Sequence, residues 1–180
     1  LFDLSVSTNN YSEQQIYIKI AEKIVDHYDQ YIDDKTLVDF YKYKGLNLLY
    51  KKPLKIESAE KANSFFEKSL KLMEELDLQS NYFFGEIYYF ISMSKIFQGL
   101  YYYDLDSVKK ANLLYDEFFH YLDKSVEYGN IAAQEWISES DFDWNNSNES
   151  FQKKMNIISR KEQDIITRSL FLSDNEKSLL

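Results

Sequence analysis

Cysteine is absent from this chain, and glycine and proline are scarce, with Gly 4 and Pro 1 in 180 residues. Without cysteine the protein has no disulfide, no thiolate nucleophile and no cysteine-ligated zinc or iron–sulfur site. An all-β sandwich or barrel of this length needs many more turn residues than these. The scarcity therefore favours long helices joined by few turns.

Excess positive charge and long apolar runs are also missing. Lysine and arginine number 21 against 30 aspartates and glutamates, for a net charge of -9. Binding nucleic acid through its phosphates needs a basic face, so we expect no nucleic-acid partner. No apolar run approaches the roughly 20 residues that cross a bilayer, so we expect no membrane span. The chain begins at Leu1, which we expect of a processed or trimmed product, and its location stays open between the cytoplasm and export after signal removal.

Aromatic residues are abundant, with Tyr 16, Phe 13 and Trp 2. This apolar mass offsets the entropy of ordering the chain, and 180 residues are enough for one full core. We therefore expect a single all-helical domain over residues 1–180. Its acidic residues concentrate in residues 1–34 and 130–149, and they either keep the surface soluble or steer a basic partner.

Apolar residues recur every three to four positions over most of the chain, which is the period of amphipathic helices. The expected helices are 12–32, one from Thr36 that closes before Pro53, 58–76, 81–98, 107–128 and 131–138. The first contains the apolar series Ile16, Ile20, Ile24, Tyr28 and Tyr31. Residues 139–149 read as an acidic loop, and residues 150–180 as a C-terminal helical segment.

Glycines and aspartates set the expected helix ends. Gly99 is expected to end the fourth helix, so that Tyr101 to Asp106 form a turn. Asp104 or Asp106 would then cap the start of the fifth helix, which ends at Gly129. Asp104-Leu105-Asp106 lacks the glycine and the distal glutamate of a calcium-binding loop, so capping is the simpler interpretation.

Two segments share one pattern: 65–72 (FFEKSLKL) and 121–128 (YLDKSVEY). Gly45 and Gly85 stand 40 residues apart as candidates for close helix crossings, and 129–134 (GNIAAQ) has the form of a Gly-x-x-x-Ala step. With 62–69 and 119–126 as partner-helix motifs, residues 36–138 resemble the tetratricopeptide superfamily, and more closely its Sel1-like branch. Most of the family's Ala-Ala pairs are Ser-Leu or Ser-Val here. The resemblance implies an α-solenoid, an antiparallel helix-turn-helix repeat array; an irregular helical bundle is the alternative.

The candidate sites are mostly aromatic. A partner-binding site is expected at Tyr88, Tyr89, Tyr101, Tyr102 and Tyr103, because tyrosine is enriched where partners dock. Many of these rings would equally serve as core. The acidic loop adds Asp141, Asp143 and Trp144, read either as a docking loop, a weak divalent site or a solvated linker.

No catalytic motif is present in the sequence. His27 and His120 are the only imidazoles and lack metal-ligand spacing, so we expect no catalytic, cofactor or metal site. The first hypothesis is a non-enzymatic scaffold that binds a protein or peptide in a groove lined by Tyr and Asn of the second and fourth helices. The second is an acidic immunity or inhibitor protein that neutralises a basic toxin or nuclease. An enzyme of an unrecognised helical class is the third.

Overall fold

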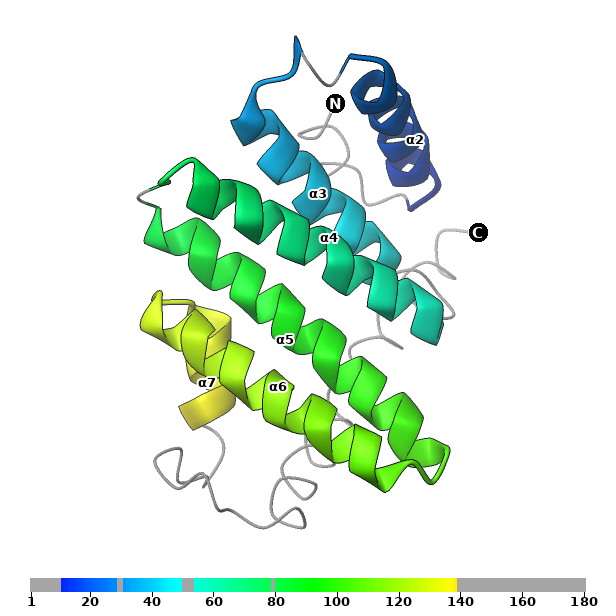
Figure 1. Ribbon diagram of the computed structural model, residues 1–180, viewed down its shortest axis with the longest axis vertical. Helices are drawn as coiled ribbons and strands as arrows, with labels where there is room; N and C mark the ends of the chain where they lie inside the picture. The colour runs from blue at the N-terminus through cyan, green and yellow to red at the C-terminus, as the bar shows by residue number, and fades with distance from the viewer. Residues whose placement is uncertain (1–10, 29–30, 50–53, 79, 139–180) are drawn as a thin grey trace, which may run out of the picture. The chain divides into compact units, whose positions relative to one another are not determined.

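The computed structural model describes residues 11–28, 31–49, 54–78 and 80–138, and all regular structure in these ranges is helical (Figure 1). The elements are α2 (Tyr11–Tyr28), α3 (Asp34–Leu49), α4 (Ile56–Glu75), α5 (Asn81–Asp104), α6 (Val108–Glu127) and α7 (Ile131–Ser138). The all-α prediction is confirmed for these residues. The chain divides into two compact units, Leu1–Glu135 and Trp136–Leu180, and almost all described residues belong to the first.

Helices α3 to α6 follow one another in space as they do in sequence. Each packs against the next along the chain, with the most extensive contacts between α5 and α6, and Figure 1 shows the four side by side. Helix α3 also touches α5, whereas α2 contacts α3 only lightly. No helix of the described residues is both long and apolar enough to cross a bilayer.

The three longest helices end in the same hydrogen-bonded motif. A residue with positive φ follows each helix: Asp77 after α4, Asp106 after α5 and Gly129 after α6. The next amide then bonds a carbonyl five residues back, as from Asn130 N to Ser125 O at 3.0 Å. These bonds satisfy the last carbonyls of each helix. Gly129 therefore ends α6 as expected.

The prediction that Gly99 ends the fourth helix is wrong, because α5 continues through Gly99 to Asp104. Tyr101 to Tyr103 consequently form the last turn of a helix and not a loop. The physical reason lies in α6, where the buried ring of Tyr115 occupies the space that a Cβ at position 99 would need. Gly99 is needed for helix packing, because the absence of a side chain lets the Tyr115 ring of α6 approach α5.

The expected capping role of Asp104 and Asp106 is also wrong. Asp104 is the last residue of α5, and Asp106 has a φ of 56° in the turn that follows. Ser107 stands at the start of α6 and makes no side-chain capping bond. Aspartate is one of the few residues that tolerate the left-handed region, which lets Asp106 take the position that glycine usually fills.

Helix α3 has a side-chain cap. Asp33 accepts hydrogen bonds from the Thr36 amide at 3.0 Å and from the Thr36 hydroxyl at 2.7 Å. These two bonds favour the ionised carboxylate and lower the pKa of Asp33. The second helix therefore begins at Asp34, two residues before the Thr36 that the sequence suggested.

Phe66 of α4 lies at the centre of the core and has no exposed surface. A Cβ at Gly45 of α3 would meet its ring at 2.5 Å, and the Phe90 ring of α5 stacks on it with centroids 5.6 Å apart. Phe66 thus joins three successive helices. Buried side chains around it include Val38, Leu49, Ala62, Met73, Ile87 and Ile91.

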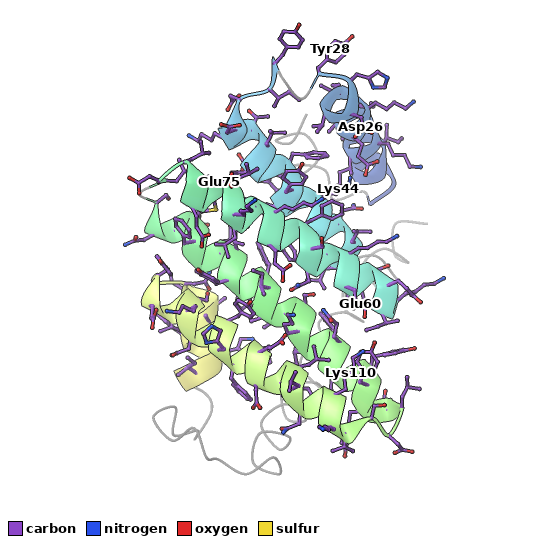
Figure 2. The ribbon with its side chains drawn as sticks, viewed as in Figure 1. Asp26, Tyr28, Lys44, Glu60, Glu75 and Lys110 are labelled. Carbon is purple, nitrogen blue, oxygen red and sulfur yellow. The ribbon has the colours of Figure 1, made fainter. Side chains whose placement is uncertain are left out.

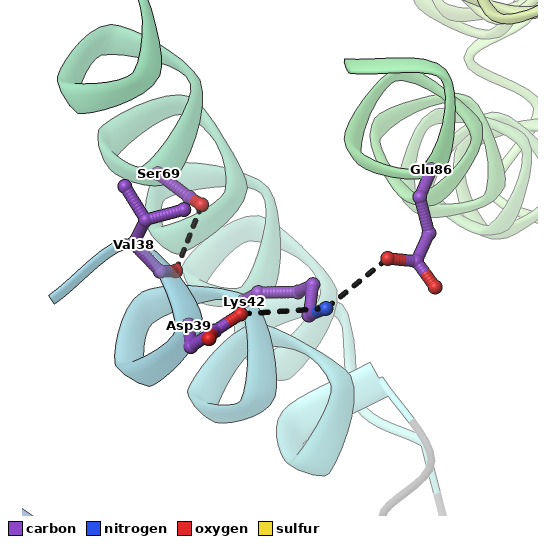
Figure 3. Close-up of polar contacts among 5 residues, drawn as sticks. All are labelled: Val38, Asp39, Lys42, Ser69 and Glu86. Carbon is purple, nitrogen blue, oxygen red and sulfur yellow. Dashed lines mark hydrogen bonds and ion pairs between the residues drawn. The ribbon is translucent and has the colours of Figure 1, made fainter. Parts of the chain in front are cut away.

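Three fully buried serines tie neighbouring helices together. Ser69 of α4 donates to the Val38 carbonyl of α3 at 2.9 Å, as Figure 3 shows. Ser94 of α5 donates to Ala59 O of α4 at 2.8 Å, and Ser125 of α6 donates to Gly85 O of α5 at 2.6 Å. In each pair the acceptor lies in the first turns of its helix. A carbonyl has two lone pairs, so it can accept the hydroxyl in addition to its own helical amide.

The apolar series expected along the first helix does not face the core. Ile16, Ile20, Ile24 and Tyr28 are each at least 39% exposed, and α2 ends at Tyr28, short of the predicted residue 32. Ile18 and Ala21 are the residues that are buried. Helix α2 is linked to α3 by the ion pair of Glu22 with Lys44, at 3.1 Å.

The remaining domain predictions fall on other parts of the chain. The acidic loop 139–149 and the C-terminal segment 150–180 lie outside the described residues. The single domain over residues 1–180 stays a prediction.

Candidate functional site

Helix α5 is apolar nearly all round, and its half-buried residues form two series on different sides. One series contains Phe83 and Glu86, which lie beside Lys42 of α3, and Phe90, which stacks on Phe66 of α4. The other faces α4 and α6 and contains Tyr88 and Tyr102. Of the predicted binding residues, Tyr88 and Tyr102 lie in the second series.

A buried lysine marks the first face. Lys42 of α3 is 5% exposed, and its ammonium lies 3.1 Å from Glu86 Oε2 of α5 and 3.6 Å from Asp39 Oδ1 (Figure 3). The same ammonium lies over the rings of Tyr43, at 4.9 Å, and Phe83, at 5.1 Å. A buried charge requires such compensation.

The electrostatics of this cluster favour the charged lysine. Burial alone would lower the pKa of Lys42, but the attraction of Glu86 and its hydrogen bond, with smaller contributions from Tyr43 and Asp39, outweigh burial. The pKa of Lys42 therefore lies above its ordinary value. The cluster is a buried cation held between two carboxylates.

An apolar stripe continues from this cluster along α5. Phe83, Phe90 and Phe97 are spaced by seven residues, Met93 lies between the last two, and all four are half-buried and pack against the core. Seven residues are about two helical turns, so these side chains share one side of the helix. We define the α3–α5 face as this stripe together with Asp39, Lys42, Tyr43 and Glu86. It offers apolar anchors in line and charge at one end.

The second face holds two of the predicted tyrosines. The Tyr88 ring stacks against Tyr121 and Tyr128 of α6, with centroids 6.2 and 5.6 Å apart. Burial raises the pKa of Tyr88. The nearby Tyr128 and the Glu74 carboxylate of α4 raise this pKa further, and Lys124 partly opposes the increase. Tyr88 is therefore a neutral phenol that contributes to packing.

Tyr102 bridges two other helices near the end of α5. Its hydroxyl donates to Glu60 of α4 at 3.3 Å, and the ammonium of Lys110 of α6 lies 3.6 Å from the ring centroid. Figure 2 shows Glu60 and Lys110 on the two helices that flank α5. These contacts fix the end of α5 between its neighbours.

The structure separates the predicted tyrosines. Tyr89 is half-buried beside Phe90, on another side of α5 from Tyr88. Tyr101 and Tyr103 are 42% and 41% exposed at the end of the helix. Asp141, Asp143 and Trp144 lie outside the described residues. The expected residues therefore do not form one site within the described part of the chain.

The sequence analysis did not single out Phe83, Phe90, Met93 and Phe97 as one side of α5. The signal was present as the seven-residue spacing of the phenylalanines, but Phe84, Ile87, Tyr88 and Ile91 lie among them and obscure it. A helix that is apolar nearly all round does not show which side its neighbours cover.

The histidines and acidic residues form no metal site in the described ranges. Within them, no three His, Asp or Glu side chains are grouped to hold an ion. His27 is exposed with Nδ1 2.8 Å from its own helix at Lys23 O, and His120 is exposed beside Tyr121.

Comparison with known proteins adds no relative. The chain matches no protein-family model, no curated protein and no solved structure.

Proposed function

We propose that this protein is a non-enzymatic scaffold whose α3–α5 face binds a helical segment of another protein. The observation that carries the proposal is the stripe of Phe83, Phe90, Met93 and Phe97, half-buried in line along α5. An amphipathic helix presents anchors at positions i, i+3, i+4 and i+7, which matches this spacing. Aromatic anchors in partly formed pockets supply most of the energy of such contacts.

The two ends of the face differ, which gives a bound helix a preferred direction. Asp39, Lys42 and Glu86 place charge beside Phe83, whereas Met93 and Phe97 at the other end are apolar. A charged group on the partner would pair at the first end and be excluded from the second. The flexible thioether of Met93 suits partners of varied shape.

The proposal includes a repeat array of the tetratricopeptide or Sel1-like type. Ser69 and Ser125 occupy the same position in the two similar segments 65–72 and 121–128. Each is fully buried, and each donates to a carbonyl near the start of the preceding helix. The hairpins α3–α4 and α5–α6 thus share an interhelical bond as well as a sequence pattern, as neighbouring repeats do.

The two glycines do not align when the hairpins are aligned on their serines. If Ser69 matches Ser125, then Val38 matches Gly85, and Gly45 lies seven residues further along its helix. Gly45 accommodates the Phe66 ring, whereas Gly85 meets Ser125 O, Tyr128 O and Asn130 at the end of α6. The serines therefore support the repeat proposal better than the two glycines do.

The test compares two surfaces on the same partner. A partner is first isolated from the native source with the wild-type chain, and its purified form is then titrated with variants. Met93→Gln with Phe97→Gln should weaken binding at least about tenfold, because two anchors are worth more than 1.4 kcal/mol together. Leu113→Gln, at an apolar residue of α6 that is 61% exposed, is the matched control.

Alanine at Tyr101 and Tyr103 tests the site that the sequence favoured. Both rings are exposed, and Tyr102 keeps its contacts with Glu60 and Lys110 in this variant. If the two alanines abolish partner binding and the Met93 and Phe97 changes do not, the α3–α5 face is not the binding surface. Helical circular dichroism should be unchanged in every variant that is scored.

A second candidate is an acidic inhibitor that neutralises a basic toxin or nuclease. The net charge of -9 favours it, together with Glu60, Glu67 and Glu74, which are exposed at seven-residue intervals along α4. This function predicts association rates that fall steeply with ionic strength. A mainly apolar contact with the α3–α5 face would keep its affinity in salt.

A further inference from the structure

A cavity between α3 and α4 lies apart from the α3–α5 face. It has a volume of about 220 Å³ and is lined by Leu37, Tyr41, Lys68, Lys71, Leu72 and Glu75. Tyr41 and Tyr43 are two residues apart on α3, which places them about 200° apart around the helix axis. We call this cavity the α3–α4 notch.

The notch has room for one side chain. Its volume is below the roughly 300 to 1,000 Å³ of sites that enclose small-molecule ligands. Leu37, Tyr41 and Leu72 are half-buried and supply apolar walls. The Tyr41 ring is held by stacking on Phe65, with centroids 6.1 Å apart. An aliphatic or aromatic side chain therefore fits better than a whole metabolite.

The rim of the notch carries positive charge. The Lys68 ammonium lies 5.7 Å from the Tyr41 ring centroid and 5.5 Å from that of Phe65. Rings attract a cation without neutralising it, and Lys68 has no ion pair with another described residue. Lys71 pairs at 3.4 Å with Glu75, but both side chains are mostly exposed, so this pair is weak.

These features complement an anion that is joined to an apolar group. The lining includes two lysines and one glutamate, on a chain whose net charge is -9. A simple anion would leave the apolar walls unused, and an apolar ligand alone would leave Lys68 unused. A negatively charged segment with an apolar residue beside its carboxylates uses both.

We propose that the α3–α4 notch binds an acidic peptide segment of a partner protein, with one apolar side chain in the notch and a neighbouring carboxylate on Lys68. The inference goes beyond the proposed function, because it assigns a second site with a different ligand chemistry. Neither site needs the other.

The probe is the peptide acetyl-Glu-Leu-Glu-amide, titrated into the full chain and followed by amide NMR. Shifts should concentrate at the residues that line the notch. The peptides Gln-Leu-Gln and Glu-Ala-Glu, with the same end groups, remove the charge and the apolar side chain in turn. Each should bind roughly two- to fivefold more weakly, the range expected for a partly exposed ion pair or a half-buried side chain. This comparison uses only the wild-type protein. Equal binding of all three peptides would overturn the proposal.

Lys68→Gln tests the residue directly, and Lys109→Gln is its matched control. Both lysines are exposed, and Lys109 lies on α6, away from the notch. Lys68→Gln should lose the preference for Glu-Leu-Glu over Gln-Leu-Gln, and Lys109→Gln should keep it. An unchanged preference in Lys68→Gln would contradict the proposal. Met93→Gln should leave peptide binding unaltered, so failure at the notch and failure at the α3–α5 face are distinguishable.

Discussion

Single side chains decide how closely these helices approach. Gly45 and Gly99 each lie against a buried ring of the next helix, and three serines reach buried carbonyls across helix boundaries. A hydroxyl that is fully buried must find a partner, because an unsatisfied polar group in a core is costly. These small residues therefore determine the spacing between helices as well as their register.

Ser125→Ala should lower the free energy of unfolding by about 1 kcal/mol, the usual net value of a buried hydrogen bond. The reason is the loss of the 2.6 Å bond to Gly85 O, whose own helix still supplies an amide donor. Ser69→Ala should cost a similar amount through Val38 O. Urea unfolding at equilibrium measures both.

Ser64→Ala is the control for these two variants. Ser64 is exposed on α4, and alanine has the higher helix propensity, so this change should be neutral or slightly stabilising. A loss at Ser64 equal to that at Ser125 would show that the interhelical bond contributes nothing.

Asp106→Gly should raise the free energy of unfolding by up to about 1 kcal/mol. Asp106 has a φ of 56°, where a side chain costs energy that glycine avoids. Its amide bond to Tyr103 O, at 3.0 Å, does not depend on the side chain. Thermal unfolding followed by circular dichroism measures the gain, and a lower melting temperature would contradict the assignment of this turn.

At the scale of the helices, α3 and α5 are joined by the Lys42–Glu86 pair across α4. Lys42→Met alone should destabilise the chain by about 1 to 3 kcal/mol, less than for a fully buried pair because the Glu86 side chain is 23% exposed. The double change Lys42→Met with Glu86→Met should cost less than the sum of the single changes. A double-mutant cycle by urea unfolding measures this coupling.

The exposed pair of Lys71 with Glu75 is the matched control, with an expected coupling of only about 0.2 to 0.5 kcal/mol.

The pH dependence of stability supplies a second check on the Lys42–Glu86 pair. Because the folded pKa of Lys42 is raised from 10.5, its contribution is fully present below that pH and is lost as the pH rises through the folded pKa. The difference between the wild type and the Lys42 variant should be constant from neutral pH to about pH 10 and shrink above it.

Most helices could be predicted from the sequence, because apolar residues recur with a helical period and Gly129 marks an end. Gly99 misled the prediction, since only its contact with Tyr115 of the next helix explains a glycine there. The site was harder to predict. Tyr88 and Tyr89 are adjacent in sequence and so point about 100° apart around α5, a separation that a run of aromatic letters does not show.

At the scale of the whole described unit, stability should be graded along the chain. Helix α5 has neighbours on both sides and contains fully buried Ile87, Ile91 and Ile96, whereas α2 packs lightly against α3 and exposes most of its isoleucines. Amide hydrogen exchange should therefore be slowest in α5 and fastest in α2 among the long helices, because local opening is easiest where few contacts break. Protection of α2 equal to that of α5 would contradict this gradient.

The serine bonds also bear on how this chain can change in length. One residue inserted inside α4 would rotate the rest of that helix by about 100° relative to the part before it. Either the bond of Ser69 to Val38 or the bond of Ser94 to Ala59 would then be lost. The described connections at 76–78, 105–107 and 128–130 carry none of these hydroxyls. Homologues that differ in size should therefore hold their extra residues in the connections and keep the helices of equal length.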